Sequence, residues 1–123
     1  MNIFSWLLIG HLVGDWLLQN DWMAANKQRH LFTLAGMTHF AIYTSCMALV
    51  LFIAKADSAR IFSIQQLLLF VIVIFVSHWL IDATAFARKW ARFTNQSDLP
   101  IVNIMVDQTF HLLVIVALIK WTL

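Results

Sequence analysis

The chain alternates between long apolar stretches and short polar connections. Each apolar stretch approaches or exceeds the roughly 20 residues that an α-helix needs to cross a bilayer, and the only proline, Pro100, stands at the start of the last one. The pattern predicts an all-α integral membrane protein, a four-transmembrane-helix bundle made of two hairpins in a single domain, residues 1–123. The predicted, unbroken spans cover residues 3–20, 31–54, 61–87 and 100–121.

Composition supports a membrane protein and argues against a soluble domain and a nucleic-acid-binding protein. Hydrophobic residues make up 62% of the chain and charged residues 11%, whereas about a quarter of residues are charged in soluble domains. The lipid bilayer is therefore the expected partner. The formal net charge of +2 comes from basic residues in the connections, so it reports topology and does not indicate nucleic-acid binding. Gly10, His11 and Asp15 interrupt the first stretch, which also lacks a basic leading segment, so we expect a mature helix and not a signal peptide.

Basic residues in the connections predict the orientation. The connections near residues 19–30 and 87–99 share one side of a four-span protein and carry five basic residues: Lys27, Arg29, Arg88, Lys89 and Arg92. The other side carries three: Lys55, Arg60 and Lys120. Because basic connections stay in the cytoplasm, we expect both termini outside a cytoplasmic membrane.

Seven ionisable residues lie inside the predicted spans, where each costs several kcal/mol unless it is paired or binds something. They are His11, Asp15, His39, His78, Asp82, Asp107 and His111. Six of them form pairs four residues apart, a spacing that places both side chains on one face of a helix. Because the only Lys or Arg within a predicted span, Lys120, stands at the far end of the last one, we expect the countercharge to come from metal ions or protons.

The His and Asp pairs are expected to lie at a similar depth in the membrane. In every pair the Asp is nearer the cytoplasmic connections and the His is deeper, and the order reverses in the last span because that helix runs the other way. His39 lies seven to eight residues into its helix, about 10–12 Å at 1.5 Å per residue. All four helices are thus expected to contribute to one layer. Gly10 and Gly14 form a small face that would let a neighbouring helix approach closely.

This set of donors predicts a metal site. Imidazole with carboxylate suits Zn, Mn, Fe, Co or Ni, and seven donors allow either two ions bridged by an Asp or one ion with supporting residues. All seven residues are candidate ligands, and His39 could instead serve as a catalytic acid or base. A proton or ion pathway, a structural polar core and a haem site are alternatives, although haem leaves the three Asp unexplained.

Three segments carry a resemblance to a known family. They are "GHLVGDWLLQNDWMAANK", "SHWLIDATAFARKW" and "VDQTFH". These segments resemble a bacterial and phage family of small integral membrane proteins of unknown function, which implies a multi-pass protein of the bacterial inner membrane but no reaction. The pattern is also loosely similar to membrane-bound metal-dependent hydrolases, which place His and Asp on transmembrane helices.

Together these features predict a metal-dependent hydrolase that acts on an amphiphilic, lipid-like substrate from the cytoplasmic leaflet. The lack of a basic residue in the layer argues against a phosphoester and leaves an amide or ester open. A divalent-metal or proton transporter, which would need to form a homo-oligomer, is one alternative. A non-enzymatic membrane partner protein with a structural metal or polar core is another.

Overall fold

The structure, a computed structural model, describes residues 1–58, 61–96 and 98–123 and contains only helices in that part of the chain. Arg60, one of the residues behind the predicted orientation, lies outside the described residues. The helical segments are α1 (Ile3–Leu12), the π-helix η1 (Val13–Leu17), α2 (Asp21–Asn26), α3 (Leu34–Ser58), α4 (Ile64–Ala83), α5 (Phe86–Phe93) and α6 (Pro100–Trp121). The all-helical fold class is therefore confirmed.

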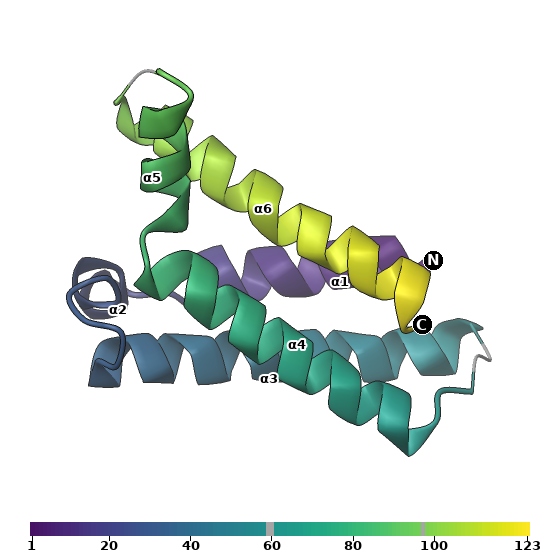
Figure 1. The fold of residues 1–123 in the computed structure, drawn as a ribbon. Coiled ribbons are helices and arrows are strands. Elements are labelled where there is room, and N and C mark those ends of the chain that lie inside the picture. Colours follow the sequence, from purple (N-terminus) through teal and green to yellow (C-terminus); the bar gives the residue numbers. More distant parts are fainter. Residues whose placement is uncertain (59–60, 97) are drawn as a thin grey trace.

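The long helices enclose a common core. Helix α3 packs against α1, η1, α2 and α4, and α6 packs against α1, α4 and α5, so that α1, α3, α4 and α6 form a closed ring of contacts. In Figure 1 both termini lie at one end of the molecule, whereas α2 and α5 lie at the opposite end. The helices thus run back and forth between two ends that differ in composition and structure.

The outer surface of the helices is apolar. Phe52 is 67% exposed, Ile72 58% and Leu113 57%, while the core between the helices is filled by residues such as Leu7, Met47, Phe70 and Ile115. Large apolar side chains on both faces of a helix are typical of a protein surrounded by lipid. Three helices, Leu34–Asp57, Ile64–Ala83 and Pro100–Trp121, are long and apolar enough to cross a membrane. The first apolar segment, Ile3–Leu17, is shorter, so a fourth span stays a prediction.

The first and third predicted helices are interrupted, which corrects the expectation of unbroken spans. Helix α1 changes into the π-helix η1 at Val13, and α4 ends at Ala83 and not at residue 87. A π-turn holds one more residue than an α-turn and is often found at functional sites. At the other break, Ala85 adopts a left-handed backbone with φ 51°, which turns the chain into α5.

Glycines allow the first segment to lie against α3. A Cβ atom on Gly14 would stand 3.0 Å from the backbone Cα of Tyr43, and one on Gly10 would collide with the Val50 side chain. The predicted close approach at Gly10 and Gly14 is confirmed. It presses η1, and with it Asp15, against the centre of α3.

Hydrogen bonds at both ends stabilise the short helix α2. The Asn20 side chain accepts a hydrogen bond from the Met23 amide at 3.0 Å, and Met23 is buried beneath the helix. The backbone N–H of Lys27 then bonds to the Met23 carbonyl at 2.9 Å and closes the last turn. This compact turn returns the chain towards the bundle and sets the starting point of the Lys27 side chain.

Candidate metal centre

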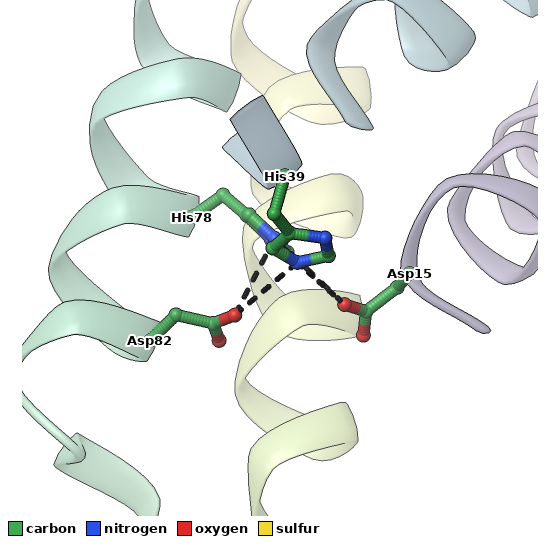
Figure 2. Close-up of side chains that lie close together, drawn as sticks. All are labelled: Asp15, His39, His78 and Asp82. Atoms are coloured by element: carbon green, nitrogen blue, oxygen red, sulfur yellow. Dashed lines mark hydrogen bonds and ion pairs between the residues drawn. The ribbon is translucent and has the colours of Figure 1, made fainter. Parts of the chain in front are cut away.

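Four buried residues from three helical segments converge at one point (Figure 2). Asp15 comes from η1, His39 from α3, and His78 and Asp82 from α4. His39 Nε2 lies 3.2 Å from Asp15 Oδ1 and 3.4 Å from Asp82 Oδ2. His78 Nε2 lies 2.9 Å from His39 Nε2 and 3.6 Å from Asp82 Oδ2. One ligand atom from each of the four residues therefore lies within 4.8 Å of all the others, which could hold a metal ion.

A second group overlaps the first and includes helix α6. Asp15, Asp107 and His111 also place one donor atom each within 4.8 Å of one another. His111 Nδ1 donates a hydrogen bond to the Asp107 carbonyl at 2.9 Å, which leaves Nε2 as a lone-pair donor. That Nε2 lies 3.7 Å from Asp82 Oδ1. Asp15 belongs to both groups, as a carboxylate that bridges two ions would.

Several donor atoms at this centre are buried without a hydrogen-bond partner among the described residues. They are Asp15 Oδ1, Asp82 Oδ1 and His111 Nε2. A buried polar atom without a partner costs about 1–3 kcal/mol, so such atoms are rare unless they serve a purpose. These three atoms belong to residues of the two donor groups and are of the kinds that ligate metals.

His11 lies beside the two groups and, among the described residues, belongs to neither. Its Nδ1 accepts a hydrogen bond from the Tyr43 hydroxyl at 3.0 Å, and its Nε2 donates one to Gln108 Oε1 at 2.7 Å. Gln108 Nε2 in turn donates to Asp15 Oδ2 at 2.7 Å. The expected direct pairing of His11 with Asp15 is thus replaced by a link through Gln108, because the π-helix turns Asp15 away from the α-helical position.

The predicted pairs on the other two helices meet as expected. His78 Nε2 stands 3.6 Å from Asp82 Oδ2, and His111 Nδ1 stands 3.6 Å from Asp107 Oδ2. Both pairs lie within regular α-helices, α4 and α6, where residues four apart share a face. The spacing rule therefore works where the helix is regular and fails where it is not.

Lys27 overturns the expectation that no basic side chain reaches this layer. Its side chain is only 11% exposed, and Nζ forms an ion pair with Asp82 Oδ2 at 2.5 Å and lies 4.0 Å from Asp15 Oδ1. It also donates a hydrogen bond to Gln19 Oε1 at 2.7 Å. Burial alone would lower the pKa of Lys27, but the carboxylates of Asp82 and Asp15 outweigh it and raise that pKa above its ordinary value of 10.5.

Tyr43 is a further residue of the site that the pattern of charges did not reveal. It is fully buried, its ring stacks on that of His78 with centroids 3.7 Å apart and an interplanar angle of 8°, and its hydroxyl holds His11. Its position four residues after His39 on α3 is a signal that could have identified it. For Lys27 the signal was weaker: a lysine in a short connection, close to the end of a span.

A cavity of about 520 Å³ leads to the centre from the end of the molecule that carries α2 and α5. Its lining includes the buried or half-buried groups Asp15, Lys27 and Asp107, together with the exposed side chains Trp16 and Arg88. Two of the donor residues, Asp15 and Asp107, therefore line an opening that carries both charged and apolar residues.

Comparison with known proteins defines the family of the chain but no activity. No curated protein and no solved structure matches the chain. The looser similarity to metal-dependent hydrolases therefore stays a prediction. A family described as "Protein of unknown function (DUF3307)" matches residues 3–123, nearly the whole chain. The protein thus belongs to this uncharacterised family, as the resemblance to a family of unknown function predicted.

Proposed function

We propose that this protein is a membrane-embedded, metal-dependent hydrolase that acts on an amphiphilic substrate from the cytoplasmic side of the membrane. The observation that carries the proposal is the pair of overlapping donor groups that share Asp15 at the inner end of an open cavity. Two ions held about 3.5–4 Å apart by such a bridge are a common arrangement in hydrolytic enzymes. Helical bundles provide such sites from carboxylates and histidines on facing helices.

Charge supports the binding of a divalent ion. With the histidines neutral, the carboxylates of Asp15, Asp82 and Asp107 and the ammonium of Lys27 carry a formal charge of −2, and all four groups are buried or half-buried. Such an excess is expensive in a lipid environment unless a cation offsets it. The mixed nitrogen and oxygen donors suit Zn, Mn, Fe, Co or Ni, and one or two such ions would fit.

The residues around the donors fit hydrolysis. A bound ion would supply Lewis acidity and an activated water. His39 Nε2 faces both Asp15 and Asp82, so His39 is placed to complete the ligand set or to move a proton between water and substrate. Gln108, held by His11, fixes the orientation of the Asp15 carboxylate.

The packing favours an enzyme over a transport pathway. Beyond the donors, the buried side chains of the described helices are mostly apolar, and Leu7, Met47 and Ile115 are fully buried. A path for ions or protons would need polar groups or water on that side too. A site open at one end suits a substrate that enters and leaves by the same route.

The first test is metal content. The protein is purified in mild detergent without chelator, and metals are measured by mass spectrometry beside a His78→Ala/Asp82→Ala variant and a control, His30→Ala, whose histidine is exposed in the connection before α3. One or two equivalents of a transition metal in the wild type and the control, lost in the double variant, would support the proposal. No metal in any sample, even after reconstitution with Zn, Mn, Fe, Co and Ni, would refute it.

A second test separates the enzyme from the transporter. The metal-loaded protein is reconstituted into liposomes that contain an ion-sensitive dye. Stable retention of the metal without flux is expected. Flux that depends on Asp82 would favour a transporter and contradict the hydrolase.

A further inference from the structure

We infer that the head of the substrate is an anionic phosphate ester, which Lys27 and Arg88 bind from two sides of the cavity. The inference rests on the proposed hydrolase function and narrows its substrate class. It reverses the expectation from the sequence, which disfavoured phosphate because no basic residue was expected near the donors. The two cations reach the cavity from different segments, Lys27 from the end of α2 and Arg88 from α5.

The charges of the completed site favour an anion. The three carboxylates of the centre, the two cations and one divalent ion add up to a formal charge of +1, and with two ions the sum is +3. A neutral amide or ester would leave that positive charge uncompensated, whereas the negative charge of a phosphate ester would offset it. In addition, a metal ion that neutralises Asp15 and Asp82 would weaken the hold of Asp82 on Lys27 Nζ, now 2.5 Å away. The ammonium could then turn to the substrate.

Arg88 is placed and equipped for this role. The left-handed turn at Ala85 sets the direction of α5, and the buried Ala87 and Ala91 seat the helix on the bundle. The Arg88 side chain lines the cavity, and one of its amino groups donates a long hydrogen bond of 3.3 Å to Gln28 across the opening. A guanidinium carries five donors in a planar fork that matches phosphate oxygens, so most of its donors remain for a ligand.

Apolar residues in the same cavity can contact the hydrocarbon part of an amphiphilic substrate. Trp16 and Ile104 line it and are 57% and 41% exposed, on η1 and α6 respectively. They lie on segments whose outer faces are apolar, so a hydrocarbon chain can pass from the cavity to the surrounding lipid. A cavity with a charged part for a phosphate and an apolar lining for a hydrocarbon chain fits a lipid phosphoester better than a soluble phosphate.

The implied reaction is simple hydrolysis. The oxygen of a water molecule forms a new bond to phosphorus, the ester P–O bond breaks, and a proton from the water passes to the departing alkoxide. The products are an alcohol and a phosphate species, and nothing is oxidised or reduced. Water is the only co-reactant.

The test is binding of a probe that cannot be hydrolysed. The full-length protein, with its metal content measured, is titrated in detergent with the phosphonate analogue of dioleoyl phosphatidic acid, with dioleoylglycerol and with inorganic phosphate, and bound ligand is read by native mass spectrometry. The variant Arg88→Gln is compared with Lys89→Gln, a matched control because Lys89 is exposed on the same helix and does not line the cavity.

We expect Arg88→Gln to weaken phosphonate binding about tenfold, the effect of losing a charge-assisted hydrogen bond, and Lys89→Gln to change it less than twofold. Dioleoylglycerol should bind at least tenfold more weakly than the phosphonate, and so should inorganic phosphate. Equal losses in the two variants, or equal binding of dioleoylglycerol, would overturn phosphate recognition. Equal binding of inorganic phosphate would overturn the lipid part of the inference and indicate a soluble anion.

The outcome separates this inference from the proposed function. Because binding is measured without turnover, a protein that retains its metal and cleaves a neutral lipid ester but does not prefer the phosphonate would overturn only the inference. A protein that holds no metal would refute the hydrolase itself, and the inference with it.

Discussion

Replacement of Lys27 tests whether its ammonium neutralises the buried carboxylates. In a Lys27→Met variant the side chain keeps its approximate length but loses the charge. Lys27 Nζ lies 4.0 Å from Asp15 Oδ1, a separation worth about 4 kcal/mol for unit charges at an effective dielectric constant of about 20, and it lies closer still to Asp82. Part of this attraction offsets the cost of burial. Removal of one partner from a buried pair typically destabilises a protein by about 3–5 kcal/mol.

The assay is thermal unfolding in detergent with a chelator present, so that bound metal does not mask the loss. The Tm of Lys27→Met should fall by about 10 °C or more, while the control Lys89→Met, at an exposed position on α5, should change little. Metal at about 100 times its Kd should then return about 2.7 kcal/mol, because the ion replaces the missing cation. Equal Tm values for the two variants in chelator would refute the assignment of Lys27 as the counterion.

Four further results are expected. Because the folded pKa of Lys27 is raised, its contribution to stability is complete below about pH 10.5 and is lost as pH rises through the folded pKa; the Tm difference between wild type and Lys27→Met should therefore narrow in strongly alkaline solution. His111→Ala should lose at least part of the bound metal by mass spectrometry, while His11→Ala, which changes no member of the two donor groups, should retain most of it. Tyr43→Phe should lower the free energy of unfolding by about 1–3 kcal/mol in denaturant titrations and leave metal content nearly unchanged, since it removes only the hydroxyl. Gly14→Ala should cost about 1–3 kcal/mol and also reduce metal content, because its new Cβ would press on the α3 backbone and displace η1.

Local features of the chain were predicted well from its sequence. The lengths of the apolar stretches identified helices α3, α4 and α6, because apolar length is a property of consecutive residues. The i,i+4 spacing placed His78 beside Asp82 and Asp107 beside His111 for the same reason. Gly10 and Gly14 correctly marked the close contact with α3, since only a missing Cβ permits it.

Features that join distant parts of the chain were not predicted. The π-helix at Val13–Leu17 carries no distinctive sequence pattern, yet it moves Asp15 away from His11 and into both donor groups. The tight turn of α2 carries Lys27 back to Asp82, far away in the sequence, although Lys27 stands in a connection and not in a span.

The sequence by itself thus determined that the chain forms apolar helices with His and Asp at matched depth. Only the tertiary structure decided which of these residues face one another, that a lysine joins them, and where a cavity opens. The physical reason is that helical periodicity and apolar length act over a few turns. The countercharge and the opening depend on how connections fold back and how helices are rotated, which is settled by packing across the whole molecule.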